Sequence, residues 1–222
     1  MKIFAGVDEA GRGPVLGPLV MAIVACTPED KKFFNKIGVK DSKLLTEPKR
    51  RKLARIIKAR CEHVIIKSSP QQIDKALINP SSSLNILEAE VSGKLIKRLL
   101  KKSKVDEVML DLPAKNKEEY LNHVRKKAET KIPIKAEFKA DLNYIEVSAA
   151  SILAKTTRDA SIKTVEKKLG FQIGSGYPAD PNTVRSLGKH FEQLKEENLV
   201  RKQWKTAKNI EDKKAQTSLS NF

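Results

Sequence analysis

The order of the apolar runs limits the fold of this chain more than any other feature. Five runs rich in β-branched and other apolar residues have the length of strands, and they lie at 2–7, 15–26, 62–68, 105–112 and 132–138. Only a turn rich in Gly and Pro separates the first two runs, and Pro18 moves the expected start of the second strand to Leu19. Helical segments separate the later runs. We therefore expect an α/β fold with a mixed five-stranded sheet flanked by helices, in which an antiparallel hairpin comes first and parallel crossovers follow.

Helical spacing and capping residues mark the segments between the strands. Helices are expected at 46–60, 84–102, 116–129, 147–169 and 181–198. Thr46 and Asn116 are candidate N-caps for two of them. We expect one domain over 1–170, an appended helical region over 171–210, and a flexible tail over 211–222, where apolar residues are almost absent.

The charge of the chain indicates a polyanionic partner. There are 44 Lys and Arg residues against 27 Asp and Glu, a net charge of +17. The basic residues cluster at 47–60, 94–104 and 201–208. In the last cluster, the aromatic residue Trp204 lies between basic residues. Each cluster is either a solvated helix face or part of a surface that follows phosphates.

The remaining composition bears on location. No apolar run has the ~18–20 residues that a membrane span needs. The two cysteines, Cys26 and Cys61, are too few for a disulfide scaffold and fit a reducing cytoplasm. We expect a cytoplasmic monomer that does not bind membranes.

Four carboxylates lie where predicted strands end. Asp8 and Glu9 follow the first apolar run, Asp111 ends the fourth, and Asp141 lies just past the fifth. In open α/β sheets, ligand sites form outside the carboxyl ends of the strands, and Mg²⁺ favours carboxylate and water oxygens. Clustered carboxylates repel one another unless cations lie between them. The positions therefore indicate a site for divalent cations; the alternative is that some of these residues are ordinary acids of strand-end turns.

The glycine-rich turn at 11–18 is not a dinucleotide-binding fingerprint. That motif requires a helix directly after its glycines, and the Gly-Pro pair at 17–18 would break such a helix. The glycines instead let the backbone approach a ligand closely. Arg12, between Gly11 and Gly13, is then placed to contact a phosphate or a base.

The helix expected at 147–169 begins with hydroxyl and basic side chains, those of Ser148, Ser151, Lys155 and Arg158. A helix N-terminus with hydroxyl groups suits a phosphate. The alternative is that the serines cap the helix or pack in the interior. The three histidines share no motif and no ligand spacing.

Several blocks of the sequence resemble ribonuclease HII, the type 2 ribonuclease H family, in its archaeal-like branch. The most specific are Val-Asp-Glu-Ala-Gly-Arg-Gly-Pro at 7–14 and the helix block at 147–159. The others lie in family order at 17–20, 40–43, 83–88, 139–141 and 174–181. The resemblance implies an RNase H-like fold. It also implies an endonuclease that hydrolyses RNA in RNA/DNA hybrids and at ribonucleotides embedded in duplex DNA.

The resemblance also implies site residues. The metal-binding and catalytic carboxylates are Asp8, Glu9, Asp111 and Asp141, with Asp106 the nearest competitor of Asp111, although it begins its strand. The substrate-binding set includes a sensor of the ribose 2′-OH, the group that distinguishes RNA from DNA, and two phosphate-binding residues. The sensor comprises Gly11, Arg12, Gly13 and Tyr177, and the phosphate-binding residues are Ser42 and Lys43.

The expected mechanism uses two divalent ions, Mg²⁺ or Mn²⁺, with Asp8 bridging them. One ion activates water for in-line attack on the phosphate 5′ of the ribonucleotide, and the other stabilises the leaving 3′-oxygen. The products then carry a 3′-OH and a 5′-phosphate.

The C-terminal end has the spacing Gln-x-x-Leu-x-x-Phe at Gln216, Leu219 and Phe222. This resembles the peptide that binds the replication sliding clamp, and the alternative is a chance match. Two other functions stay open: a nucleic-acid-binding module without catalysis, and a related phosphodiester enzyme such as a resolvase or integrase. Binding without cleavage would favour the module, and the site of the cut separates the two enzymes.

Overall fold

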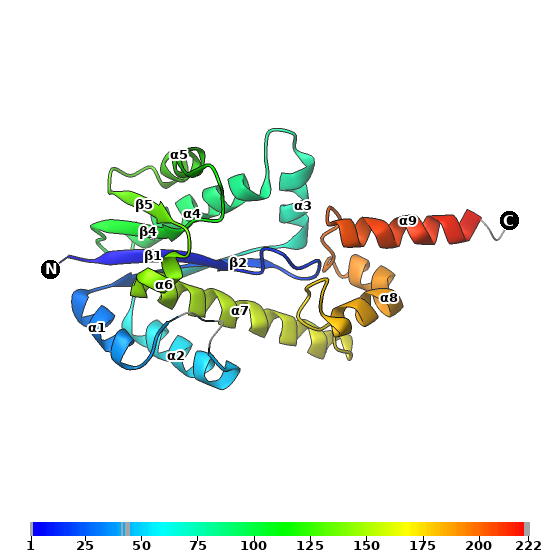
Figure 1. The fold of residues 1–222 in the computed structure, drawn as a ribbon, viewed down its shortest axis with the longest axis horizontal. Coiled ribbons are helices and arrows are strands. Elements are labelled where there is room, and N and C mark those ends of the chain that lie inside the picture. The colour runs from blue at the N-terminus through cyan, green and yellow to red at the C-terminus, as the bar shows by residue number, and fades with distance from the viewer. Residues whose placement is uncertain (1, 41, 43–44, 220–222) are drawn as a thin grey trace. The chain divides into compact units, whose positions relative to one another are not determined.

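The computed structural model describes residues 2–40, 42 and 45–219, of which 215 and 217–219 are described by their backbone alone (Figure 1). The strands are β1 (Phe4–Ala10), β2 (Leu19–Cys26), β3 (His63–Ser68), β4 (Glu107–Asp111) and β5 (Ile134–Glu137). The helices are α1 (Pro28–Lys36), α2 (Glu47–Arg60), α3 (Pro70–Ile78), α4 (Leu84–Leu100), α5 (Lys117–Ala128), α6 (Ala140–Asn143), α7 (Ile145–Leu169), α8 (Pro181–Glu196) and α9 (Lys205–Leu219).

The chain forms two compact units. Unit 1 consists of Met1–Ala10, Val20–Lys67 and Leu84–Thr157. Unit 2 consists of Gly11–Leu19, Ser68–Ser83 and Arg158–Phe222. The glycine-rich turn therefore belongs to unit 2, although it follows β1 of unit 1 directly. The expected domain boundaries at 170 and 210 stay predictions.

Unit 1 contains the sheet, whose strand order is β3-β2-β1-β4-β5. β1 pairs antiparallel with β2, whereas β1 with β4 and β4 with β5 are parallel. The expected mixed sheet, with the hairpin first and the crossovers later, is confirmed. β1 extends to Ala10, three residues further than its apolar run, so Asp8 and Glu9 lie within the strand.

Helices cover both faces of the sheet in unit 1 (Figure 1). α4 and α5 lie on one face, and α1, α2 and α7 on the other. The helices α1, α2 and α7 pack on the face of the sheet to which alternate residues of β2 point. These residues, Val20, Ala22, Val24 and Cys26, share a core cluster with residues of the three helices. β1 and the start of α7 come very close together at Gly6, where an added Cβ atom would lie 2.3 Å from the backbone of Glu146 and Val147. Only glycine fits there.

Unit 2 has its own apolar core. Val15 and Leu16 of the glycine-rich turn pack in it with residues of α7, α8 and α9. Asp180 caps α8 by accepting a hydrogen bond from the backbone nitrogen of Asn182 at 2.9 Å. α9 packs in the same core through Ala207, which is fully buried, and Ile210.

Four of the helices in the described part of the chain are not among those expected from the sequence: α1, α3, α6 and α9. α1 and α3 begin with complete capping boxes, at Thr27–Asp30 and Ser69–Gln72. Their sequences therefore do contain a signal for the start of a helix, although each helix is only nine residues long. α9 extends over residues 211–219, for which a flexible tail was expected. The local sequence lacks apolar periodicity there, and the helix is continuous with the packed residues before it.

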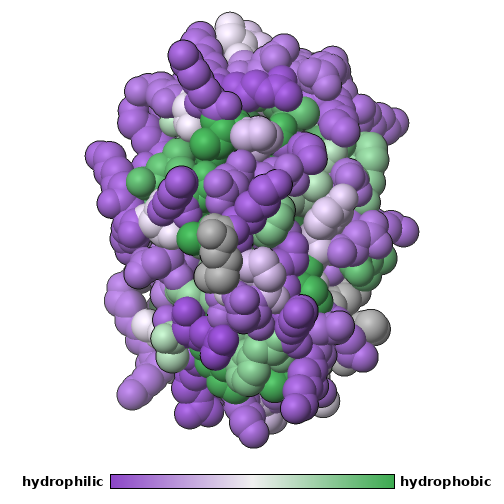
Figure 2. Space-filling view, turned by 90° about the vertical axis from the view of Figure 1, so that its left-hand side faces the viewer, coloured by the Kyte–Doolittle hydropathy of each residue, from purple (hydrophilic) through white to green (hydrophobic). Residues whose placement is uncertain are grey.

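Hydrophilic side chains predominate on the face of the molecule that Figure 2 shows. Figure 2 shows one face, on which hydrophilic side chains surround small apolar areas. Within residues 2–40, 42 and 45–219, no helix is both long and apolar enough to span a membrane.

Candidate functional site

An acidic cluster lies at one end of the central strands in unit 1. Asp8 and Glu9 come from β1, and Asp111 ends β4, its parallel neighbour. The register places Val7 beside Leu110, so Asp8 and Asp111 come next on the two strands. One carboxylate oxygen from each of Asp8, Glu9 and Asp111 lies within 4.8 Å of the others. Three of the four predicted carboxylates therefore converge.

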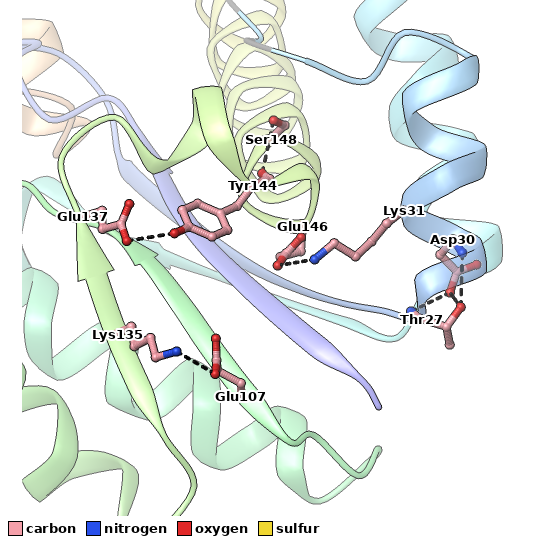
Figure 3. Close-up of polar contacts among 9 residues, drawn as sticks. All are labelled: Thr27, Asp30, Lys31, Glu107, Lys135, Glu137, Tyr144, Glu146 and Ser148. Carbon is pink, nitrogen blue, oxygen red and sulfur yellow. Dashed lines mark hydrogen bonds and ion pairs between the residues drawn. The ribbon is translucent and has the colours of Figure 1, made fainter. Parts of the chain in front are cut away.

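The fourth carboxylate, Asp141, is carried by α6. This short helix is fixed at its start, because the backbone nitrogen of Ala140 donates to Oδ1 of Asp111 at 2.8 Å. It is fixed at its end by Tyr144, whose hydroxyl donates to Oε1 of Glu137 in β5 at 2.8 Å (Figure 3). Asp141 is itself buried, and its negative charge acts on Asp8. The structure therefore brings Asp141 near the cluster, outside the group of three.

The electrostatics of Asp8 show what this arrangement costs without cations. Burial raises the pKa of Asp8 to about 8, a hydrogen bond from Ser151 opposes the rise, and the charges of Asp111 and Asp141 add to it. A divalent cation would remove this repulsion. The donors are hard carboxylate oxygens, which Mg²⁺ and Mn²⁺ accept, so these residues fit such a cation.

Two predicted phosphate-binding serines lie beside Asp8. Ser151 hydrogen-bonds Asp8, and its Oγ lies 2.9 Å from Oγ of Ser42. The segment of Ser42 is held by Arg50, whose Nη1 donates to the carbonyls of Ser42 and Leu45, each at 2.8 Å. Both serines are buried. They support Asp8, and Lys43 lies outside the described residues.

Ser148 lies in the interior at the start of α7. Its hydroxyl donates to the carbonyl of Asp141 at 2.5 Å, and the side chain is buried. Figure 3 shows it at the start of α7, directed to the backbone at Tyr144. The hydroxyl proton of Ser148 is therefore used within the protein, which favours the packing alternative, and a role of Ser148 in substrate binding stays a prediction. Lys155 is partly exposed on the same helix.

A buried tyrosine that the sequence did not single out lies within reach of the charges of the acidic cluster. Tyr120 of α5 is buried, and its hydroxyl lies 3.1 Å from Oγ of Ser92 in α4. Burial raises the pKa of Tyr120, Ser92 opposes the rise, and the charges of Glu9, Glu88 and Asp111 add to it. Glu88 is the last residue of the block at 83–88, a block that resembles the family but carries no predicted role.

Unit 2 brings the predicted sensor residues together. Gly11 has φ +89°, and a Cβ atom there would lie 2.3 Å from Nε of Arg158. A Cβ atom on Gly13 would lie 3.5 Å from Cε1 of Tyr177. The Tyr177 ring is 39% exposed and has the guanidinium of Arg158 5.4 Å from its centroid. The backbone of Gly11–Gly13 therefore passes against Arg158 and Tyr177, with Arg12 partly exposed between them.

Two arginines of the basic clusters and one of the helix block have side chains that the fold encloses. Arg50, Arg158 and Arg201 are buried. Arg158 donates to the carbonyl of Ser175 at 2.8 Å, and burial lowers its pKa. Arg201 donates to carbonyls of the glycine-rich turn. Burial and these backbone contacts argue against phosphate binding by Arg50 and Arg201. The substrate-binding role of Arg158 stays a prediction.

The residues of the predicted clamp-binding spacing fall at the end of the described chain. Gln216 is exposed on α9. Leu219 ends α9 and is described by its backbone alone, and Phe222 lies outside the described residues.

Comparisons with known proteins agree with the resemblance. The family model described as Ribonuclease HII matches residues 5–207. Ribonuclease HII of Thermococcus sibiricus is 42% identical over 228 residues, covering 100% of this chain and 98% of the relative. The crystal structure of ribonuclease H2 from Pyrococcus horikoshii superposes with a TM-score of 0.85 at 36% identity, covering 95% of this chain and 98% of that one. The PCNA:RNase HII complex from Archaeoglobus fulgidus matches with a TM-score of 0.80 at 35% identity, covering 91% and 95%.

Proposed function

The chain belongs to the ribonuclease HII family, whose members are nucleases that cleave RNA in RNA/DNA hybrids. We propose that it also cuts duplex DNA at embedded ribonucleotides. In this proposal, the acidic cluster holds two divalent cations. The convergence of Asp8, Glu9 and Asp111 within 4.8 Å carries the proposal. Asp141 supplies the fourth carboxylate. The cut lies 5′ of the ribonucleotide and leaves a 3′-OH and a 5′-phosphate.

The acidic residues and their neighbours have separate roles in this proposal. Bound Mg²⁺ or Mn²⁺ supplies activation of water and stabilisation of the leaving oxygen. Asp8 and Asp111 hold cations from adjacent strands, and Ser151 keeps Asp8 oriented through its hydrogen bond. The hydrogen bond from Ala140 to Asp111 holds one of the Asp111 oxygens in place.

The substrate is recognised by residues of unit 2. The backbone of Gly11–Gly13 reads the ribose 2′-OH, and the ring of Tyr177 stacks on the adjoining sugar. The position of Gly13 beside Tyr177, where an added Cβ atom would make an ordinary contact with the ring at 3.5 Å, supports this pairing. Aromatic rings stack on nucleotides without depending on sequence.

The decisive experiment uses a DNA duplex that contains one ribonucleotide. We expect a single cut 5′ of that nucleotide when Mg²⁺ or Mn²⁺ is present, and no cut after EDTA treatment. Asp8→Asn is expected to abolish the cut while the variant still folds. Binding without cleavage, or normal turnover by Asp8→Asn, would exclude the proposed chemistry.

The role of Tyr177 is tested with two variants. Tyr177→Ala is expected to lose selectivity for the junction between DNA and RNA, whereas Tyr177→Phe keeps the ring and most of the selectivity. The comparison substrate is a uniform RNA/DNA hybrid of the same sequence. If both variants cut both substrates as the wild type does, the assignment of Tyr177 is wrong.

The proposal extends to a sliding clamp as partner. A relative at 35% identity has been solved as a complex with PCNA, and this chain has the spacing Gln216, Leu219 and Phe222. The double variant Leu219→Ala/Phe222→Ala is expected to lose clamp binding, measured by isothermal titration calorimetry. Thr217→Ala with Ser220→Ala changes the intervening positions and serves as the control. Binding that survives the first pair would exclude this segment. The monomeric state and the cytoplasmic location stay predictions.

A further inference from the structure

Arg201 lies in unit 2 against the turn that carries the sensor residues. Its side chain is completely buried. Nη2 donates to the carbonyl of Gly11 at 2.6 Å, Nη1 to that of Arg12 at 3.0 Å, and Nε to that of Gly17 at 3.0 Å. All three guanidinium nitrogens therefore hold backbone of one turn, which a single ammonium group could not do.

Trp204 continues this contact to the next peptide. Its Nε1 donates to the carbonyl of Gly13 at 3.1 Å. The guanidinium of Arg201 lies 4.8 Å from the centroid of the Trp204 ring, so the two side chains also support each other. Three consecutive carbonyls, those of Gly11, Arg12 and Gly13, are thus held by two side chains from one short segment.

Backbone pairing fixes that segment to the same turn. The backbone nitrogen of Arg201 donates to the carbonyl of Val15 at 2.9 Å, and that of Gly17 donates to the carbonyl of Leu199 at 2.9 Å. Leu16 and Val200 form an antiparallel bridge. The segment 199–204 is therefore a rigid support, and its side chains need no large rearrangement to hold the turn.

Because the peptide group is planar, holding its carbonyl also sets the direction of its N–H group. In a trans peptide the C=O and the N–H point in opposite directions. Fixing the carbonyls of Gly11 and Arg12 on Arg201 therefore directs the N–H groups of Arg12 and Gly13 away from that guanidinium. Arg158 closes the Gly11 side, where a Cβ atom would lie 2.3 Å from its Nε. The direction of the two N–H groups is set by buried contacts.

We infer that Arg201 and Trp204 are positioning residues for ribose recognition. They hold the Gly11–Gly13 backbone so that its N–H groups meet the 2′-OH of the ribonucleotide. This inference rests on the proposed function and names the residues on which its selectivity depends. The physical reason is that a hydrogen bond to one hydroxyl discriminates only if its partner is fixed before the substrate arrives.

The test couples a protein variant to a change in the substrate. Trp204→Phe keeps an aromatic ring and removes the N–H that holds Gly13 together with the smaller ring of the indole. Arg201→Lys keeps the charge and leaves one donor nitrogen in place of three. The control, Lys202→Gln, removes an exposed neighbouring cation. Each full-length protein is assayed with Mn²⁺ on two duplexes, one with a ribonucleotide and one with a 2′-fluoro nucleotide at the same position.

We expect the 2′-fluoro substitution to lower kcat/KM of the wild type and of Lys202→Gln by the same factor. For Trp204→Phe the factor is expected to be smaller by about tenfold, the worth of one oriented hydrogen bond. A purely structural role would lower both rates equally and leave the factor unchanged, and that result in a folded Trp204→Phe overturns the inference.

Other outcomes are also decisive. If Arg201→Lys does not fold, Trp204→Phe carries the test alone. If the wild type cuts neither duplex, the proposed function fails and this inference fails with it. An active wild type with additive effects overturns the inference only.

Discussion

The hydroxyl of Ser151 donates a hydrogen bond to the carboxylate of Asp8. Ser151 has one proton to donate, so Ser42, whose Oγ lies 2.9 Å away, is the donor of the next hydrogen bond in the chain. This relay favours the charged form of Asp8 against the effects of burial and of the neighbouring carboxylates. It links a residue of α7 to the part of the acidic cluster that comes from β1.

Ser151→Ala is expected to weaken the response to metal. Removing the donor raises the pKa of Asp8 further, so the acid limb of the rate profile moves to higher pH. The metal concentration for half-maximal rate is expected to rise about tenfold, as for other partners of metal ligands. The measurement is a Mn²⁺ titration at pH 6.5 and 8.5. Ser161→Ala, on the same helix, is the control, and identical titrations for the two variants would contradict the prediction.

Asp8→Asn is expected to stabilise the protein in the absence of metal. The pKa of Asp8 is raised by burial from 3.8 to about 8, so between these values the native state binds more protons than the unfolded state. The stability of the wild type therefore falls as pH rises through this window, whereas the side-chain amide of the variant does not titrate.

Urea unfolding in EDTA at pH 4, 6 and 8 measures this difference. The advantage of the variant should grow with pH, and a constant advantage would contradict the assignment. Mn²⁺ at 100 times its Kd should stabilise the wild type by about 2.7 kcal/mol. The variant should gain much less, because one ligand is lost.

Gly6→Ala is expected to destabilise the fold by about 3 kcal/mol. The added Cβ would lie 2.3 Å from the backbone of α7, where no flexible side chain can give way. Gly188→Ala is the matched control, because it lies in α8 with nothing within 4 Å of the added atom. That change should stabilise the protein by about 0.5–1 kcal/mol. Equal urea midpoints for the two variants would show that the contact at Gly6 is not restrictive.

Cys26 is expected to resist alkylation in the native protein. A hydrogen bond with the Cys61 thiol and burial raise the pKa of Cys26, so the reactive thiolate is scarce at pH 8. Iodoacetamide labelling followed by mass spectrometry should modify Cys26 only after denaturation. Rapid modification of the folded protein would contradict the burial of this side chain.

The sheet and its acids could be predicted because their signals are local. Strand length, the turn before Leu19 and the positions of Asp8 and Asp111 are all legible within a few residues. The error in β1 was small: the strand continues through Asp8 to Ala10, since pairing with β2 extends it beyond its apolar run. The sequence blocks at 7–14 and 147–159 led to the correct family for the same reason.

The basic residues show where sequence reasoning failed. Arg201 was grouped with Lys202 and Lys205 as one cationic cluster, yet it is buried while those two are exposed. All three side chains are basic, and the three residues lie close together in the sequence. Their environments differ because Arg201 meets the turn at Gly11, 190 residues away.

The sequence by itself determined the mixed sheet, the carboxylates and the family, because each depends on residue type at short spacing. Only the tertiary structure decided that Ser148 binds backbone and that residues 211–219 continue a helix. It also decided that Arg201 and Trp204 hold the glycine turn. Such roles depend on which backbone groups, distant in the sequence, accept hydrogen bonds from a side chain in the folded protein. Hydrophobic periodicity along the chain does not predict these long-range hydrogen bonds.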